Sequence, residues 1–405
     1  MPAYTVISYE QVQGTIPVTE IYNFLVEKYH EQLEISQGIV VAPINEQIPP
    51  HNINFFINDF LPILKELNDN YRMALRPVIL MNVCLIDRHI HLHRPSNLNQ
   101  TLGSAFNIIE LEPFRLYTYL QNNFNTDYSA QPIDRVSDNN KYLCKFGKLN
   151  KPNSFLIFGL LKDTGLLQEE HGLWSLAFNN SKDFKDETDE VFAMLHLLEY
   201  VQNIPRYDYS KYHKVLDRDF SNSFERGQMH YTGFPFDVNH YANTRYSIVR
   251  ETNCGNEINL FISEKTWLPI SMKHPFMLFA TSRVAKYLRD SGYVSLDDFQ
   301  MSELGNVNFS EAKELFVENH NKFLTTSKAE IQNMVEHNYE LFLKHVKSDI
   351  DKLLSMPAEF LNLGCHEMTG TFLDLLLIMH YPNREVDPVN DNWDWQALRQ
   401  YSPDK

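Results

Sequence analysis

The chain has 405 residues, of which 43% are hydrophobic and 22% are charged. This composition is typical of globular proteins and excludes a disordered or a fibrous chain. At about 150 residues per domain, the length predicts two or three domains. The formal net charge is −16, so the surface as a whole is unsuited to bind nucleic acid or anionic lipid, although a local basic groove is compatible with this value.

The lack of a recognisable targeting signal and the spacing of the cysteines predict a cytoplasmic protein. The first residues, MPAYTVISYEQVQG, lack the basic and apolar regions of a signal peptide. No apolar run approaches the roughly 18 residues that a membrane span needs, so we expect no membrane partner. The four cysteines, at positions 84, 144, 254 and 365, are too far apart for a CxxC pair and indicate reduced thiols instead of a disulfide framework.

The first third of the chain predicts a parallel sheet. Residues 38–43 (GIVVAP) and 78–86 (VILMNVCLI) are short continuous apolar runs, which are typical of strands buried on both faces. Between them, apolar residues recur at spacings of three and four over residues 53–68, which predicts a helix. Strand, helix and strand in this order form a βαβ unit, so we expect an α/β fold.

A second series of alternating elements follows a polar stretch at 122–140, which we interpret as a linker between domains. We expect strands at 141–146, 246–249 and 275–280, and helices at 153–164 and 282–290 that end near glycines. From the capping box of Ser327 and Glu330 onward, the sequence predicts mainly helix. The predicted domains are an N-terminal domain at 1–135, a second domain at 140–305 and a helical C-terminal extension at 306–405.

The strongest candidate site lies in the second domain, where charged residues follow predicted strands. Arg250 and Glu251 end one strand, and Ser263 is the predicted N-cap of a helix that Pro269 shortens or kinks. Ligands of open α/β sheets bind beyond the carboxyl ends of the strands, and a helix start offers N–H groups and a positive dipole end to an anion. Lys265 adds a full positive charge at this helix start.

This pattern predicts a nucleoside diphosphate site, in which Lys265 and backbone amides bind the phosphates and Glu264 accepts hydrogen bonds from the ribose hydroxyls. An alternative stays open, because S-E-K before a helix is common. Glu264 would then only offset the helix dipole, and Lys265 would be a solvated side chain. The candidate donor-binding residues are Arg250, Glu251, Ser263, Glu264, Lys265 and Thr266.

Two stretches of the chain resemble a known family. The segment YSIVRETN…INLFISEKTWLPISMKHPFMLFATSRVAKYLRDSGY, within residues 246–293, resembles the donor-binding half of the α1,3-fucosyltransferase family and related phage-encoded glycosyltransferase-like proteins. In that family a strand ends in a Glu-Asn pair and is followed by a T/S-E-K helix start and a strand that opens with a small residue and proline. Residues 141–176, from KYLCKFGKLN to LWSL, resemble the entry to the same domain.

The resemblance implies a GT-B architecture, in which two Rossmann-like domains face each other across a cleft and the C-terminal one binds the nucleotide-sugar donor. It implies that Glu264 binds the donor ribose, that Lys265 binds the diphosphate, and that Glu251 occupies the position of the family's characteristic carboxylate. It also implies catalysis without a metal or another cofactor.

One turn departs from the family pattern. Relatives carry an Arg or a His-Arg pair there, whereas this chain has Asn153 and Ser154. Lys148 and Lys151, which precede the turn, and Arg250 are therefore the candidate phosphate contacts.

A histidine cluster follows the strand predicted at 78–86. Alternation places His89, His91 and His93 on one face of an extended segment that begins at Asp87. Three imidazoles on one face could bind zinc, one could act as a general base, and a polar loop with surface histidines is an equally weighted alternative. In a GT-B layout this segment lies at the cleft-facing end of its domain, so Asp87 and His91 are the candidates for the catalytic base.

These observations favour a hexosyl- or pentosyltransferase that moves a sugar from a nucleotide-sugar to an acceptor hydroxyl, by an inverting mechanism and without metal. We expect a glycan or a small molecule as acceptor. The alternative is a hydroxymethylated base in phage DNA, which requires base flipping and a basic groove. Arginines at positions 72, 76, 88 and 94 would have to supply that groove. Two other classes stay open: a non-catalytic GT-B-like binding module, and a zinc-dependent hydrolase that uses His89, His91 and His93.

Overall fold

The computed structural model describes residues 4–7, 12, 16–44, 55–82, 106–112, 114–116, 118–119, 132–133, 136–148, 151–168, 170–177, 195, 200–212, 238–255 and 260–354. The chain divides into two compact units, Met1–Leu116 with Lys347–Lys405, and Tyr117–Val346. Within the described ranges, no helix has both the length and the apolar character that crossing a membrane requires.

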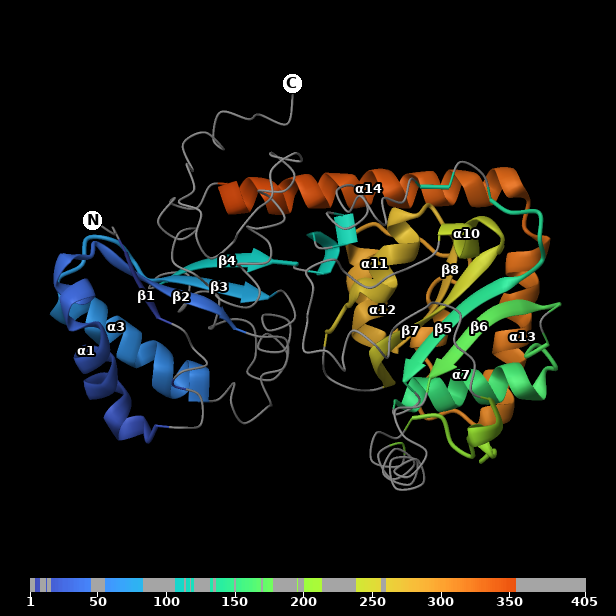
Figure 1. Cartoon of the computed structure of the whole chain (residues 1–405), viewed down its shortest axis with the longest axis horizontal. Helices are drawn as coiled ribbons and strands as arrows, with labels where there is room; N and C mark the ends of the chain where they lie inside the picture. The colour runs from blue at the N-terminus through green and yellow to red at the C-terminus, as the bar shows by residue number, and fades with distance from the viewer. Residues whose placement is uncertain are drawn as a thin grey trace. The chain divides into compact units, whose positions relative to one another are not determined.

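The first unit contains a parallel sheet whose spatial order β1-β2-β3-β4 follows the chain. Its strands are β1 (Tyr4–Ile7), β2 (Gly38–Ile44), β3 (Val78–Asn82) and β4 (Asn107–Leu111), and its helical segments are α1 (Val18–Ile35), η2 (Phe56–Phe60) and α3 (Leu61–Asn70). Right-handed crossovers in this order place successive helices on the same face of the sheet. In agreement, α1 and α3 contact each other and share one apolar core with β1 and β2 (Figure 1).

The predicted helix at 53–68 appears in this unit as η2 followed by α3. Among the residues whose spacing of three and four predicted it, Phe60, Leu64 and Leu67 are buried. The strand predicted at 78–86 is described as far as Asn82. The βαβ interpretation of this region is therefore confirmed.

The second unit contains another parallel sheet, with the order β6-β5-β7-β8. Its strands are β5 (Tyr142–Lys148), β6 (Gly172–Ala177), β7 (Tyr246–Gly255) and β8 (Phe276–Thr281). From β5 the chain passes to β6 on one side and then returns to form β7 on the other side of β5. The strand order thus reverses between β5 and β7, and such a switch point is where open α/β sheets bind their ligands.

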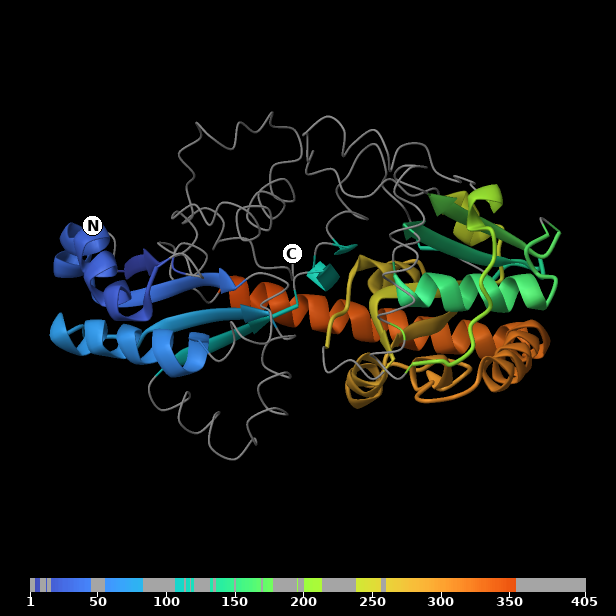
Figure 2. The same cartoon turned by 90° about the horizontal axis from the view of Figure 1, so that it is seen from below.

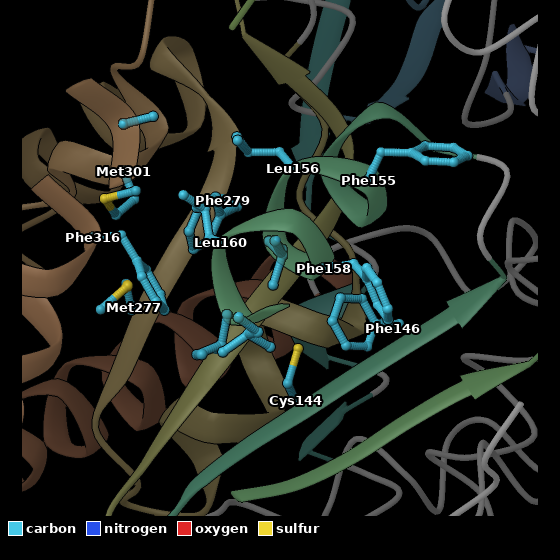
Figure 3. Close-up of a cluster of buried hydrophobic side chains, with 14 of the residues drawn as sticks. Cys144, Phe146, Phe155, Leu156, Phe158, Leu160, Met277, Phe279, Met301 and Phe316 are labelled. Atoms are coloured by element: carbon cyan, nitrogen blue, oxygen red, sulfur yellow. The ribbon is translucent and has the colours of Figure 1, made fainter. Parts of the chain in front are cut away.

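Both faces of this sheet are covered, because neighbouring residues of one strand enter different cores. Cys144 belongs to a large core that also contains residues of α7 (Pro152–Asp163) and α13 (Phe309–Thr325), whereas Leu143 belongs to a smaller core with Met272. Figure 3 shows the large core, with Phe155, Leu156, Phe158 and Leu160 of α7 among its side chains. α7 and α13 lie side by side in this unit in both Figure 1 and Figure 2. The continuous apolar runs of the sequence reflect this double coverage.

Glycines and capping residues mark the ends and starts of the helices of this unit. Gly165 follows α7 with φ 75°, and Gly292 follows α12 (Ser282–Asp290) with φ 90°. These left-handed conformations are readily available only to glycine. Ser327 Oγ accepts a hydrogen bond from Glu330 N at the start of α14 (Lys328–Leu354), 3.2 Å away. Asn308 and Glu311 form a full capping box at the start of α13, which the sequence analysis did not predict.

The grouping of the residues divides the predicted C-terminal extension, with residues 306–346 in the second unit and Lys347–Lys405 in the first. α13 contributes Phe309, Phe316 and Phe323 to the large core, and α14 belongs to this unit as far as Val346. Two residues of the predicted linker are also buried there, because Ile133 and Val136 lie in apolar clusters of the same unit. Each of the two units contains a parallel sheet and helices, so the predicted α/β class is confirmed.

Candidate functional site

A buried carboxylate joins strand β7 to the start of α11 (Glu264–Ser271). Glu251 is fully buried. Its Oε1 accepts a hydrogen bond from Ser263 N at 3.0 Å and another from Thr266 Oγ1, and its Oε2 accepts one from Ser263 Oγ at 2.7 Å. Both carboxylate oxygens are therefore engaged inside the protein. Glu251 fixes the position of the helix start relative to the strand.

The helix start itself has the predicted N-cap. Ser263 Oγ accepts a hydrogen bond from Lys265 N at 3.3 Å while it donates to Glu251. Pro269 lies within α11, and the helix is only eight residues long, as its proline predicts.

The other end of α11 is fixed to the same strand by a buried histidine. His274 lies 2.9 Å from Ser247 Oγ through Nδ1 and 3.0 Å from the Thr244 carbonyl oxygen through Nε2. Burial lowers the pKa of His274 to about 4, so this imidazole is neutral at pH 7. α11 is thus tied to β7 by Glu251 at its start and by His274, three residues after its end, so its start forms a platform fixed to the strand.

Two charged side chains project from this platform without being buried. Lys265 Nζ lies 2.7 Å from Glu264 Oε1 and 3.4 Å from Ser263 Oγ. The Lys265 side chain is 32% exposed and the Glu264 side chain 14% exposed. An ammonium and a carboxylate that are adjacent and partly accessible can bind an anion and a hydroxyl of the same ligand.

The start of α7 lies at the same edge of the sheet. Asn153, in the first turn of α7, is fully buried and donates from Nδ2 to the carbonyl oxygens of Glu251 and Phe279, both at 3.1 Å. Regular pairing of β7 with β8 runs as far as Arg250 and Phe279, but β7 itself continues to Gly255, so Glu251 follows the regularly paired part and does not end its strand as predicted. Asn153 therefore brings the start of α7 next to the strand that carries Glu251. Sequence reasoning treated Asn153 only as a departure from a family pattern and missed this role.

Replacing Asn153 by aspartate is expected to destabilise the second unit by roughly 1–3 kcal/mol, because a carboxylate cannot donate to the two buried carbonyls. The measurement is urea unfolding followed by circular dichroism. Asn321→Asp, an exposed change on α13, serves as the control. An unfolding midpoint for Asn153→Asp equal to that of the control would contradict the assigned hydrogen bonds.

The remaining predicted donor-site residues fall into two groups. Arg250, Ser263 and Thr266 are buried, with at most 5% of each exposed. Alternation along β7 places Arg250 on the same face of the sheet as Ile248, which belongs to the large core. Lys151 is half-buried at the cap of α7, and Lys148 is the last residue of β5, its side chain lying outside the description.

Known proteins add nothing to this geometry. Comparisons with models of protein families, with curated proteins and with solved structures found no match to this chain.

The predicted acceptor-side residues are not part of this description. Asp87, His89, His91 and His93 all lie outside the described residues. Elsewhere, in the part of the chain that is described, no group of three or more His, Cys, Asp or Glu side chains is placed to hold a metal ion. The candidate site consequently rests on the carboxyl edge of the second sheet.

Proposed function

We propose that the protein is a glycosyltransferase whose second unit binds the nucleoside diphosphate part of a nucleotide-sugar donor. The observation that carries this proposal is the pair of Glu264 and Lys265, partly accessible and held at a helix start at the carboxyl edge of a parallel sheet. The pair begins the helix that follows β7, one of the two strands that flank the switch point where folds of this kind bind nucleotides.

The two accessible side chains have different tasks in this proposal. The ammonium of Lys265 binds the diphosphate and stabilises the negative charge that develops when the sugar leaves it. The carboxylate of Glu264 accepts hydrogen bonds from the ribose hydroxyls. Glu251, Ser263 and Thr266 are positioning residues, since their side chains hold the helix start and are buried.

Electrostatics favours the start of α7 as a further phosphate contact. The start of α11 already has two carboxylates, Glu251 and Glu264, which offset its dipole. The first turn of α7 contains no acidic residue, and its cap residue is Lys151. A diphosphate bound by Lys265 gains most if its other end lies toward α7, where Lys148 and Lys151 add positive charge.

The acceptor side completes the proposal. An acceptor hydroxyl must lose its proton as it attacks the sugar, and Asp87 and His91 are the candidates for this base. We propose a GT-B arrangement, an inverting and metal-independent reaction, and a glycan or small molecule as acceptor in preference to a hydroxymethylated base in DNA.

A thermal-shift titration tests the proposed function. GDP, UDP and ADP are added separately, with and without EDTA. Stabilisation by one of them that EDTA does not change supports the transferase. A response to none of them contradicts it and favours a non-catalytic binding module, while destabilisation by EDTA alone favours a zinc-dependent hydrolase.

Glu264→Gln is expected to remove the preference for a ribose over a deoxyribose. A hydrogen bond to a carboxylate is worth roughly 1.5–3 kcal/mol, so the wild-type protein should bind the ribonucleotide at least about tenfold more tightly than its 2′-deoxy form. The variant should bind both alike. Titration calorimetry with the two nucleotides measures this ratio, and an unchanged ratio in the variant would contradict the role of Glu264.

A further inference from the structure

A short turn covers the outer edge of the second sheet. β8 is the last strand in the order of that sheet. Ser295 Oγ lies 2.8 Å from the carbonyl oxygen of Phe276, and Ser302 Oγ donates to the carbonyl oxygen of Leu278 at 2.7 Å. We call residues 295–302 the edge turn. Its serines satisfy two carbonyls, two residues apart, on an edge that would otherwise be open to pairing with another strand.

The edge turn contains a carboxyl group that is completely buried. Asp297 has 0% of its surface exposed. Its Oδ1 lies 2.6 Å from Ser295 Oγ and accepts a hydrogen bond from Phe299 N at 3.2 Å. Its Oδ2 is buried and has no hydrogen-bond partner within the described part of the chain. Hydrogen bonds from Ser295 and from the backbone of Asp297, Phe299 and Met301 favour the charged form, but burial outweighs them and favours the neutral acid.

The backbone next to this carboxyl group is strained. Asp298 and Phe299 have φ values of 47° and 58°, in the left-handed region that costs non-glycine residues energy. The hydrogen bond from Phe299 N to Asp297 Oδ1 lies within this strained segment.

The hydrogen-bond geometry around Ser295 distinguishes the protonated from the ionised form of Asp297. The hydroxyl of Ser295 has a single proton, yet its oxygen lies within hydrogen-bond distance of two acceptors, the carbonyl of Phe276 and the carboxyl of Asp297. If Asp297 is ionised, only one of these two contacts can be a hydrogen bond. If Asp297 is protonated, it donates to Ser295 Oγ, and Ser295 donates to Phe276, so that both contacts are satisfied.

We propose that Asp297 is protonated when the edge turn is closed on β8, and that loss of this proton weakens the hold of Ser295 on the sheet edge. The attachment of the edge turn to the second sheet therefore depends on pH. In the protonated form, Asp297 donates a hydrogen bond to Ser295 Oγ, and Ser295 donates one to the Phe276 carbonyl oxygen.

The charged surroundings agree with this proposal. From β7, the phenol of Tyr246 faces Asp297 and is itself neutral, because burial raises its pKa. From α12, Arg289 pairs with Asp298 and Glu303. From α13, His320 contacts Tyr246 through Nδ1 at 2.6 Å, and burial lowers the pKa of this imidazole to about 4.

The sign of the pH effect follows from burial, which raises the pKa of Asp297 from 3.8 to about 6. The folded protein then holds this proton more tightly than the unfolded chain does. The resulting contribution to stability is fully present below about pH 4 and is lost as the pH rises to about 6.

The test is the melting temperature of the full chain between about pH 4 and about pH 7, for the wild type and for Asp297→Asn. The amide cannot ionise, but it donates to Ser295 only by turning Nδ2 to the place of Oδ1, where it no longer accepts from Phe299 N. The test is therefore the shape of the profile. The melting temperature of the variant relative to that of the wild type should fall as the pH falls below about 6.

Asp298→Asn is the matched control, because Asp298 lies in the same turn with its side chain 76% exposed. This variant should follow the wild-type pH profile. Two results would overturn the proposal. One is an Asp297→Asn profile parallel to that of the wild type, which means that Asp297 does not change its protonation in this range. The other is failure of Asp297→Asn to fold, or a wild-type melting temperature that rises relative to that of the variant as the pH increases, because either means that the fold needs the ionised carboxylate.

Discussion

Replacing Lys265 by alanine is expected to weaken the binding of a nucleoside diphosphate by roughly 2–4 kcal/mol, the cost of removing a charged partner from a buried ligand contact. Lys265 is the side chain at the start of α11 that combines a positive charge with partial exposure, at 32%. The same change should alter folding stability by only about 0–1 kcal/mol, because a partly exposed ion pair contributes little. Titration calorimetry measures the affinity, and urea unfolding measures the stability.

A second lysine serves as the control for this experiment. Lys286 on α12 also forms an ion pair, with Asp290, and its side chain is 64% exposed. Lys286→Ala removes one positive charge from the same unit but leaves the carboxyl edge intact, so it should bind the nucleotide as the wild type does. Equal affinities for both variants would show that Lys265 does not contact the diphosphate.

Replacing Glu251 by alanine is expected to destabilise the second unit by roughly 3–5 kcal/mol. The carboxylate accepts hydrogen bonds from Ser263 N, Ser263 Oγ and Thr266 Oγ1, and all of these donors would be left without an acceptor in a buried place. Glu251→Gln keeps the size of the side chain and one oxygen, so its loss should be clearly smaller. Urea unfolding of both variants measures the difference.

A positioning role also predicts a functional loss for these variants. The helix start that carries Lys265 would no longer be fixed to β7, so Glu251→Gln should bind a nucleoside diphosphate more weakly even under conditions where it is folded. Glu303→Ala is a suitable control, because Glu303 is 44% exposed and pairs with Arg289. If Glu251→Ala unfolds at the same urea concentration as Glu303→Ala, the carboxylate does not hold α11.

The strands β5, β7 and β8 of the second sheet could be predicted because each depends on local signals, whereas β6 (Gly172–Ala177) was not predicted as a strand. The apolar run at 275–280 predicts the core of β8 (Phe276–Thr281), which is buried throughout. Ser263 predicts the start of α11 because a serine before a helix caps it. An apolar run or a helix cap involves only residues that are close together in the sequence, so it can be recognised in a single sequence.

The roles of Glu251 and Asn153 could not be predicted in the same way. A carboxylate near the end of a strand can face a ligand or a neighbouring helix start, and the choice depends on packing between segments that are distant in the sequence. Glu251 reaches residues 12 and 15 positions further along the chain, and Asn153 reaches Phe279, 126 positions away. The sequence therefore identifies the chemical groups of the candidate site, but not which of them hold the site together.

The proton on Asp297 illustrates the same limit. Leu296, Asp297 and Asp298 form an ordinary polar turn in the sequence, and nothing in their order indicates that one carboxyl group is buried and the next exposed. Burial of Asp297 beneath the edge of β8 is a property of the assembled unit.

The most direct test of the central claim is a crystal structure of the protein with the nucleoside diphosphate that stabilises it. Our account predicts that the diphosphate lies within hydrogen-bond distance of Lys265 Nζ and beside the first turn of α7, with the ribose hydroxyls at the carboxylate of Glu264. A nucleotide bound elsewhere, with Lys265 still paired only with Glu264, would contradict the account.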